Sequence, residues 1–520
     1  MRCSSSRLMP KNRTRSHAWR KFIHRGRRSC FAHLSHSGMI ADCGVAGQAA
    51  IDVLPDDVLL DIFDFCLDRP RELYIDRIKM WQRLVHVCGR WRDIIFQSPR
   101  RLNLQILCTI RTPAREMLGI WPTLPLTVLV GYSPPTWSTE NILSVIEHRD
   151  RIHRLSIGSP PISLLESLIF MMQEPFPVLS SLNLSLYGRM ATRTRIPDSF
   201  LGGSTPNLRN LSMENVSFPA LPTILSSATN LVTLSLQNVP NSGYISPEAM
   251  ITSLSLLTKL ECFKLRFHSC RSCRGPEKQH SPLPTRVDLP VLTRFEFRGV
   301  SEYLEVLVAR IHSPLLNYLD IIFFNQPVFH TSHLSQFIGR IPKFRSLKEA
   351  RVVFSGGNMS VRVPSPARPL GDTVLTLGIS HRDPSWWPST LAQLYTPVFP
   401  LFLAVEQLYM RLPPAHWQVI EGRDFEWLEL LQPFAAVKNL YLSRKVAQHV
   451  APALQELAFH ERVTEELPAL QNIFLGDLQP TGSVQEAINY FAYTRWISGQ
   501  PVAVFQWEVE KSMRWEVCEG

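Results

Sequence analysis

Two short stretches, Leu208-Arg-Asn-Leu-Ser-Met213 and Leu231-Val-Thr-Leu-Ser-Leu236, place apolar residues at the same three positions. In each, a second apolar residue follows the first after three positions, and a third follows after two more. The last two alternate with polar residues, as side chains alternate across a half-buried strand. The residues just before them, Pro206-Asn207 and Thr229-Asn230, are typical of turns. Each stretch therefore predicts one short β-strand with one apolar face.

The same spacing recurs along most of the chain, with successive starts 23 to 33 residues apart. A repeat of this length indicates a solenoid, in which no single unit can bury its own apolar face. The pattern is similar to the leucine-rich repeat, which implies an α/β fold: a curved solenoid with a parallel sheet over residues 101–478. The other copies lie at Ile152/Leu155/Ile157, Leu179/Leu182/Leu184, Leu260/Phe263/Leu265, Leu292/Phe295/Phe297, Leu316/Leu319/Ile321, Leu347/Ala350/Val352, Val374/Leu377/Ile379, Val405/Leu408/Met410, Val437/Leu440/Leu442 and Leu470/Ile473/Leu475.

Segments between and after the strands carry helix signals. Helical returns are expected at residues 139–147, 161–172, 424–431 and 445–459. Ser483-Val-Gln-Glu486 has the spacing of a capping box and predicts a helix with Val484, Ile488 and Phe491 on one face. Residues 502–508 then alternate like an edge strand. Residues 479–520 are therefore expected to close the end of the solenoid, because its last repeat needs a cover.

Residues 49–100 follow a different, helical pattern. Pro55 suits the first turn of a helix, and Asp56 and Asp57 suit its positive N-terminus. Apolar residues continue at helical spacing to Leu67, and a second apolar series runs from Trp81 to Ile95. The segment predicts three short helices, whose small core needs another surface to dock against.

Leu54-Pro55, Val58-Leu59, Ile62-Phe63 and Leu67, followed by Val87-Cys88 and Trp91-Arg92, resemble the F-box. This helical module attaches substrate receptors to a Skp-type adaptor in cullin-based ubiquitin ligases. The connector, residues 68–80, is longer and more charged than usual, and an ordinary helical cap is the alternative. With the repeats, the chain resembles fungal F-box proteins with degenerate leucine-rich repeats over roughly residues 50–510. The resemblance implies an adaptor-binding set: Leu54, Pro55, Leu59, Ile62, Phe63, Val87, Cys88 and Trp91.

The positive charge of the chain lies in its N-terminal segment. The 520 residues carry a formal net charge of +11, but ten of the 55 Lys and Arg lie within residues 1–38, which hold no acid. The rest of the chain therefore has 45 basic residues against 44 acidic ones, so no nucleic-acid partner is expected. Residues 1–48 are predicted to be a disordered basic tail. A transit peptide, a nuclear-localising arm or an untranslated extension are the alternatives for residues 1–38.

The sequence lacks the features typical of membrane proteins, secreted disulfide-rich proteins and common enzyme families. No apolar run approaches the roughly 18–20 residues that cross a bilayer, so no membrane contact is expected. Ten cysteines without a dense framework favour a reducing compartment, the cytoplasm or the nucleus. No phosphate loop, nucleophile elbow or metalloprotease motif is present, so neither enzymatic activity nor a cofactor is expected. His268, Cys270, Cys273 and His280 offer four zinc ligands, but their spacing fits no common finger, and a flexible loop is favoured over a metal site.

Side chains alternate across a strand, so the residue between the second and third triplet positions, and the residue after the third, face away from the apolar core. They are small and polar in early repeats, charged in middle ones and aromatic in late ones. Tyr and Arg are enriched at interface hot spots, so Tyr409, Arg411, Tyr441 and Phe474 form the candidate target patch, with a chance set of outward positions as the alternative. The leading hypothesis is a non-catalytic substrate receptor that binds a Skp-type adaptor, through it a cullin, and an unknown protein target. A repeat scaffold independent of ubiquitin ligation is the second hypothesis, and a metal-dependent or organellar protein is the third.

Overall fold

A computed structural model of the protein shows a mixed α/β fold with a large, mostly parallel β-sheet. The chain forms two units: unit 1, residues 1–172 with 176–179, and unit 2, residues 173–175 with 180–520. The residues that the structure describes are 54–67, 84, 87–97, 104–110, 114–120, 123–130, 138–158, 160, 162–186, 195–270, 286–326, 328–344, 347–355, 358–365, 368–380, 402, 404–411, 427–459, 464, 466–476 and 482–507.

Unit 1 contains two helices of the N-terminal segment and three strands that pair in parallel in chain order. The expected basic tail and most of the middle helix of the N-terminal segment lie outside the described residues. The elements are α2 (Asp56–Leu67), α4 (Gly89–Gln97), β1 (Leu104–Leu107), α5 (Ala114–Ile120), β2 (Leu126–Val130), α6 (Thr139–Ile146), β3 (Ile152–Gly158) and α7 (Ile162–Met171).

Unit 2 contains one sheet with the strand order β4-β5-β6-β7-β9-β11-β14-β13-β12-β15-β16-β17-β18. The short strands β8 (Val287–Asp288) and β10 (Ile311–His312) form a separate parallel pair. The strands of the sheet are β4 (Ser181–Ser185), β5 (Asn210–Glu214), β6 (Thr233–Val239), β7 (Cys262–Phe267), β9 (Arg294–Gly299), β11 (Tyr318–Phe324), β12 (Glu349–Ser355), β13 (Asn358–Ser365), β14 (Arg368–Ser380), β15 (Gln407–Arg411), β16 (Asn439–Leu442), β17 (Asn472–Gly476) and β18 (Ala503–Trp507).

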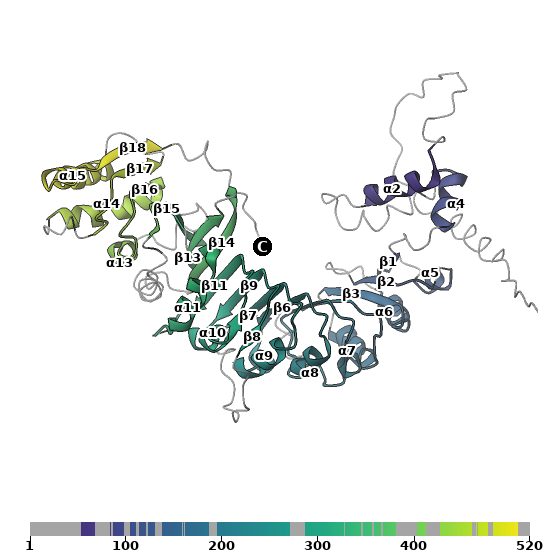
Figure 1. Cartoon of the computed structure of the whole chain (residues 1–520). Helices are drawn as coiled ribbons and strands as arrows, with labels where there is room; N and C mark the ends of the chain where they lie inside the picture. Colours follow the sequence, from purple (N-terminus) through teal and green to yellow (C-terminus); the bar gives the residue numbers. More distant parts are fainter. Residues whose placement is uncertain are drawn as a thin grey trace, which may run out of the picture. The chain divides into compact units, whose positions relative to one another are not determined.

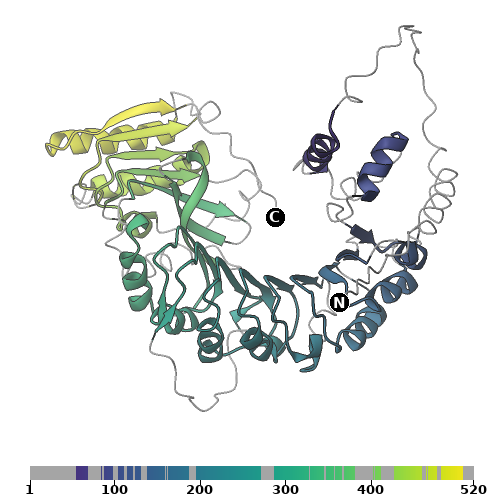
Figure 2. The ribbon, with the colours of Figure 1, turned by 45° about the vertical axis from the view of Figure 1, so that its right-hand side comes forward.

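Helices and short 3-10 turns connect these strands. In Figure 1 the helices α8 to α11 lie side by side along one face of the sheet of unit 2, and Figure 2 shows the same arrangement from another side. Among the described helices of the chain, none combines the length and the apolar character needed to cross a membrane. The elements are η4 (Phe200–Gly203), α8 (Leu221–Ser227), η5 (Asn241–Gly243), α9 (Pro247–Leu254), α10 (Ser301–Val308), α11 (Ser332–Arg340), η7 (Pro342–Phe344), α13 (Trp427–Leu431), α14 (Arg444–Phe459) and α15 (Ser483–Ile497).

Local capping explains where several helices begin. The side chain of Ser138 accepts a hydrogen bond from the Asn141 amide at the start of α6, and that of Ser246 accepts one from the Ala249 amide at the start of α9. The Glu305 carboxylate in α10 accepts hydrogen bonds from the main-chain amides of His333 and Leu334, in the first turn of α11, at 2.8 Å each. This contact ties two successive return helices together.

The repeat triplets form the core as the sequence predicted. The second and third residues of every predicted triplet lie in a strand. In most of the sheet the second residues are paired, as Leu182, Leu211, Leu234 and Phe263 are in β4 to β7. They are buried to 1% exposure or less, so the stacked repeats share one continuous apolar layer.

Two further repeats in unit 1 escaped the sequence pattern. Register aligns Ile106 of β1 and Val128 of β2 with Leu155 of β3, the second residue of a predicted triplet. The first triplet position in these two repeats is held by Asn103 and Pro125, neither of which is a large apolar residue. The sheet therefore begins earlier than the first recognisable triplet.

The region from β11 to β15 departs from simple stacking. Strand β13 is antiparallel to both β12 and β14, and the three form a meander within the sheet. As a result β11 pairs with β14 and β12 pairs with β15, so chain order and sheet order differ here. Register also aligns Leu319 with Leu375 rather than with Leu377, so the triplet at Val374 is displaced by two residues.

The expected helical returns and terminal cap are present, with small differences. Helices α6, α7 and α14 match the expected returns, and α13 lies within the expected return at residues 424–431, of which residues 424–426 lie outside the described residues. Helix α15 follows Gly482, which takes the N-cap position, so Ser483 does not form the predicted capping box. Ile488 and Phe491 are buried as expected, whereas Val484 is half-buried.

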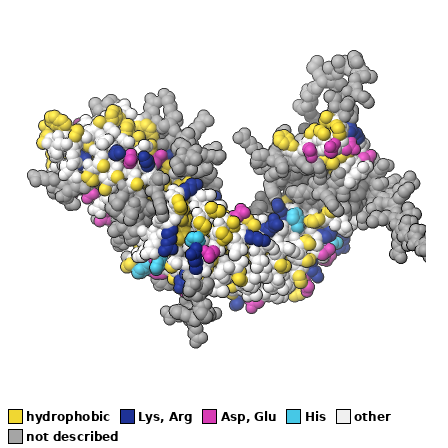
Figure 3. Space-filling model, in the orientation of Figure 1, with side chains coloured by type: hydrophobic (Ala, Val, Ile, Leu, Met, Phe, Trp, Pro, Cys, Tyr) yellow, Lys and Arg dark blue, Asp and Glu magenta, His cyan; other side chains and the backbone are white. Residues whose placement is uncertain are grey.

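Strand β18 pairs in parallel with β17 and so extends the sheet, while α15 packs against α14. The Arg495 side chain of α15 is fully buried, and its Nη2 lies 3.4 Å from the carbonyl oxygens of Leu467 and Leu470. These contacts hold the helix on the turn that precedes β17. Figure 3 shows hydrophobic side chains at the surface over α15; the exposed ones are Tyr490, Tyr493, Trp496 and Ile497.

Candidate functional site

One row of side chains crosses the whole sheet of unit 2. In each strand with a triplet other than β14, the member of this row is the residue between the second and third triplet positions, which faces away from the apolar core. In β14 and the strands without a triplet, it is the residue that the register aligns with that position, so the members are neighbours across the sheet. The row, called the central row below, runs from uncharged polar through charged to aromatic side chains. Its members in sheet order are Asn183, Ser212, Ser235, Lys264, Glu296, Asp320, Thr376, Arg362, Arg351, Tyr409, Tyr441, Phe474 and Phe505.

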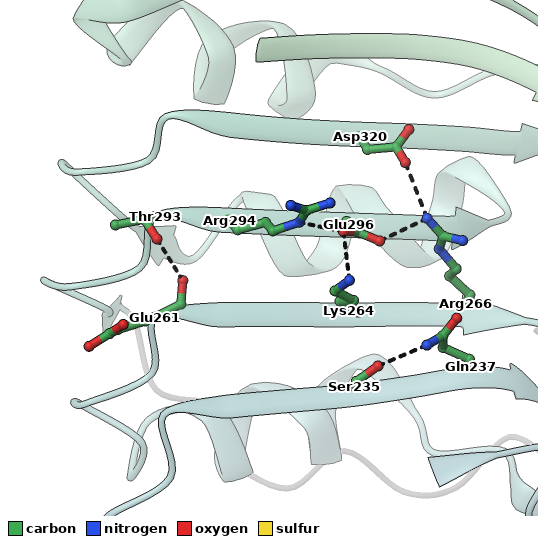
Figure 4. Close-up of polar contacts among 9 residues, drawn as sticks. All are labelled: Ser235, Gln237, Glu261, Lys264, Arg266, Thr293, Arg294, Glu296 and Asp320. Carbon is green, nitrogen blue, oxygen red and sulfur yellow. Dashed lines mark hydrogen bonds and ion pairs between the residues drawn. The ribbon is translucent and has the colours of Figure 1, made fainter. Parts of the chain in front are cut away.

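Glu296 of β9 is the centre of the charged part of the row. Figure 4 shows three cations directed at its carboxylate: Lys264 at 3.1 Å, Arg266 at 2.7 Å and Arg294 at 2.5 Å. The Glu296 side chain is only 2% exposed. Burial alone would raise its pKa, but hydrogen bonds from Arg294 and Lys264, with the charge of Arg266, hold the pKa below its usual value. The carboxylate is therefore ionised and acts as a fixed anchor for the cations around it.

Asp320 of β11 is the next acid along the row. One oxygen lies 3.3 Å from Arg266 Nη2, which also binds Glu296 (Figure 4). Burial raises the pKa of Asp320, because removing a carboxylate from water costs more than its neighbouring arginines return. Beside it, the Arg294 guanidinium lies 4.0 Å from the ring centroid of Tyr318, whose pKa burial raises to about 12.

Two cross-strand pairs place arginine directly opposite arginine. Arg266 pairs with Arg298 across β7 and β9, and Arg351 pairs with Arg362 across β12 and β13. Like charges in such positions repel. The pKa of Arg298 is lowered first by burial and further by the charge of Arg266. One Arg298 amino group donates to the Ser380 hydroxyl at 2.8 Å, while its buried Nε has no hydrogen-bond partner among the described residues.

The aromatic end of the row is a ladder of stacked rings. Ring centroids are 4.2 Å apart between Tyr409 and Tyr441, 4.4 Å between Tyr441 and Phe474, and 5.3 Å between Phe474 and Phe505. The first two pairs are within 9° of parallel. Trp507 of β18 meets Tyr409 and Tyr441 edge-on, at 6.0 and 5.4 Å. These rings hold one another in place, so the ladder is a rigid, half-buried apolar surface.

The charged and aromatic parts of the row meet at Arg351. Its guanidinium lies 5.8 Å from the ring centroid of Tyr409, and its Nε donates to Glu349 at 2.6 Å. The Tyr409 hydroxyl donates to the Gln407 side chain at 3.2 Å. Burial raises the pKa of the Tyr409 phenol, and Tyr441 and Glu349 raise it further, so this hydroxyl stays protonated. The junction offers a positive charge, a hydroxyl and an aromatic surface in one place.

The structure brings together three of the four residues of the predicted target patch. Tyr409, Tyr441 and Phe474 are successive rungs of the ladder, and Arg411 lies two residues after Tyr409 on the same face of β15. The prediction missed Arg362, because β13 carries no triplet. It also missed Phe505 and Trp507, although the alternation of residues 502–508 was a signal that could have placed them beside Phe474.

The N-terminal segment has a small core of its own. Leu59 and Phe63 of α2 are buried, as are Ile94 and Ile95 of α4. The Phe63 and Trp91 rings lie 4.7 Å apart. Arg90 of α4 donates to the Leu54 carbonyl oxygen and pairs with Asp56 at 2.7 Å. These contacts fix the start of α2 against α4.

Other residues of the predicted adaptor-binding set face outward. Pro55 and Ile62 are exposed, Leu54, Cys88 and Trp91 are half-buried, and Val87 is 58% exposed. Val58, Ile62 and Phe65 of α2 follow helical spacing and are 39, 36 and 73% exposed. They form an exposed apolar stripe beside the buried pair Leu59 and Phe63. The resemblance did not name Phe65, the most exposed of the three.

The structure describes two of the four possible zinc ligands. His268 and Cys270 follow β7, and Cys270 is exposed, whereas Cys273 and His280 lie outside the described residues. Within the described part of the chain, no group of three or more potential metal ligands lies together.

Neither a protein-family model nor a curated protein matches this chain.

Proposed function

We propose that the protein is a substrate receptor of a cullin-based ubiquitin ligase. In this proposal α2 and α4 bind a Skp-type adaptor, and the central row of unit 2 binds the protein to be modified. The receptor supplies proximity rather than a catalytic group. It would act in the cytoplasm or the nucleus, where such ligases work.

The exposed stripe Val58, Ile62 and Phe65 carries the adaptor half of the proposal. A helix that already buries Leu59 and Phe63 against α4 has no internal need for a second apolar face. Exposed apolar side chains at this spacing suit insertion into a hydrophobic groove, where a few anchors dominate the affinity. Pro55 and Val87, both exposed, match positions of the F-box resemblance.

The target half rests on the aromatic ladder. Rigid aromatic side chains lose little conformational entropy on binding, and here neighbouring rings already fix their positions. The half-buried Arg411, two residues after Tyr409 on β15, adds charge beside the apolar surface. The ladder therefore has the composition of an interface hot spot.

The test is co-purification of a Skp-type adaptor with the full chain. The wild type is compared with the L54A/P55A variant and with V58E/F65E, which places charges on the apolar stripe. F170E is the matched control, because Phe170 of α7 is 74% exposed, like Phe65. Adaptor recovered with the wild type and with F170E, and lost with both double variants, supports the proposal.

Circular dichroism and thermal melting must first show that the variants fold. If the folded wild type recovers no adaptor, the ligase proposal is wrong, and a repeat scaffold independent of ubiquitin ligation becomes the better account.

A further inference from the structure

The middle of the outward face carries more positive than negative charge. On the strands from β7 to β15, the described carboxylates are Glu296, Asp320 and Glu349. The cations on the same face are Lys264, Arg266, Arg294, Arg298, Arg351, Arg362 and Arg411. The body of the chain is close to neutral as a whole, so this excess is a local property of the face.

Internal ion pairs do not use all of these cations. Glu296 binds three of them, and Glu349 binds Arg351. Among the described residues, no carboxylate lies within ion-pair distance of Arg362, and Arg298 faces Arg266 with its Nε lacking a partner. In each cross-strand pair, Arg351 or Arg266 already has a carboxylate partner, so the positive charge that an added anion would balance lies on Arg362 and Arg298.

The contacts within the face show which anion fits. Three of these arginines pair with carboxylates at 2.5 to 2.7 Å, in Arg294–Glu296, Arg266–Glu296 and Arg351–Glu349, whereas Arg298 donates to the Ser380 hydroxyl at 2.8 Å. A nucleic acid is disfavoured, because single strands bind by stacking bases on free ring faces. Both faces of the Tyr441 ring are already covered, by Tyr409 and Phe474.

We infer that the partner segment bound by this face is an acidic peptide, with its carboxylates on Arg298 and Arg362 and an apolar side chain against the ladder. The order of groups follows the central row, in which Arg362 and Arg351 directly precede Tyr409. This inference deepens the proposed function, because it states the chemistry of the target. Its test does not need the adaptor.

The probe is a fluorescein-labelled twelve-residue peptide that repeats Asp-Glu-Leu-Asp-Glu-Phe twice. The comparison peptide has Asn and Gln in place of Asp and Glu. Fluorescence anisotropy with the full chain is expected to show the acidic peptide binding at least about tenfold more tightly, with an affinity that falls as salt rises. The R298Q/R362Q variant should lose about tenfold or more, since each side chain supplies a charge-assisted contact.

The control variant is R286Q, which removes an exposed arginine that lies before β8 and pairs with Asp288. It changes the net charge without touching the face and is expected to bind like the wild type. Equal binding of the acidic and amide peptides, or unchanged binding by a folded R298Q/R362Q variant, overturns the inference. Tighter binding of a phosphoserine version, or of a thymidine oligonucleotide that R298Q/R362Q also loses, overturns the choice of a carboxylate peptide.

The two proposals fail in different ways. Adaptor recovery without peptide selectivity removes only the acidic-target inference. Peptide selectivity without adaptor recovery removes only the ligase assignment.

Discussion

The ring of Tyr409 stacks on that of Tyr441, with centroids 4.2 Å apart and an angle of 8° between the ring planes. The two residues come from parallel strands 32 positions apart in sequence, and the register places them directly opposite each other. One repeat therefore positions the side chain of the next.

The Y409A/Y441A variant is expected to weaken target capture, because it removes the two tyrosine rings of the ladder. The measurement is quantitative mass spectrometry of proteins recovered with the wild type and with the variant. F170E provides the control for loss of an exposed aromatic group. A folded double variant that recovers the same proteins at the same level would remove the ladder as the target surface.

Within the ladder, Tyr441 should matter more for stability than Phe505. Tyr441 stacks on both sides, whereas Phe505 stacks, among the described residues, on Phe474 and is 46% exposed. At about 0.5–1.5 kcal/mol per aromatic pair beyond area burial, Y441A should cost about 2–3 kcal/mol and F505A about 1 kcal/mol. Urea unfolding measures both, and an equal cost would contradict the ladder as a stabilising element.

The pH dependence of stability should report on Glu296. Its pKa is held below the ordinary value of about 4.3, so it contributes stability above that value and loses it as pH falls through the lower folded-state pKa. In E296Q this contribution is absent. The stability advantage of the wild type over E296Q should therefore shrink as urea unfolding is repeated from pH 7 down to pH 3.

Asp320 should give the opposite pH dependence of stability and therefore serves as the control. Burial raises its pKa, so its charged form costs stability as pH rises from about 3.9 to the higher folded-state value. The wild type should gain stability relative to D320N as pH falls over the same range. The same trend in both variants would contradict the assigned environments.

Arg495 should be essential for the terminal cap. Its fully buried side chain reaches the carbonyl oxygens of Leu467 and Leu470, so R495A leaves buried carbonyls without their donor and opens a cavity. A loss of about 3 kcal/mol is expected from an unmade buried, charged contact. Hydrogen exchange should rise in β17 and β18 and stay unchanged in β5 and β6. R495K keeps a cationic nitrogen and should restore part of this loss, because a single atom, Nη2, makes both carbonyl contacts.

The sequence was most informative where apolar spacing determines position. The triplets located the strands because their second and third apolar residues are two positions apart and so face the same side of a strand. The first apolar residue, three positions earlier, reaches the same core from the turn before the strand. The triplets also implied the ladder, since outward residues such as Tyr409 and Tyr441 fall at equal places in successive repeats. The spacing of apolar residues does not, however, predict which strands pair when the partners are distant in sequence.

Strand β13 illustrates that limit. Met359, Val361 and Val363 alternate as in any half-buried strand, and nothing in that pattern says that β13 separates β12 from β14. Arg362 was missed for this reason. The capping box failed for a local one: Gly482 takes the N-cap position with a φ of 156° that suits glycine, so Ser483 moves into the helix.

The meander also interlaces the two parts of the unit 2 sheet. In a plain solenoid, repeats can be trimmed one after another from either end, because each touches only its neighbours. Here residues 349–355 belong to the stack that continues to β18, whereas residues 368–380, later in the chain, belong to the stack that begins at β4. The two stacks are interlaced in sequence, so any single cut between β11 and β15 separates at least one strand from its own stack. A truncation of unit 2 between β11 and β15 is therefore expected to expose strand edges that are paired in the intact chain.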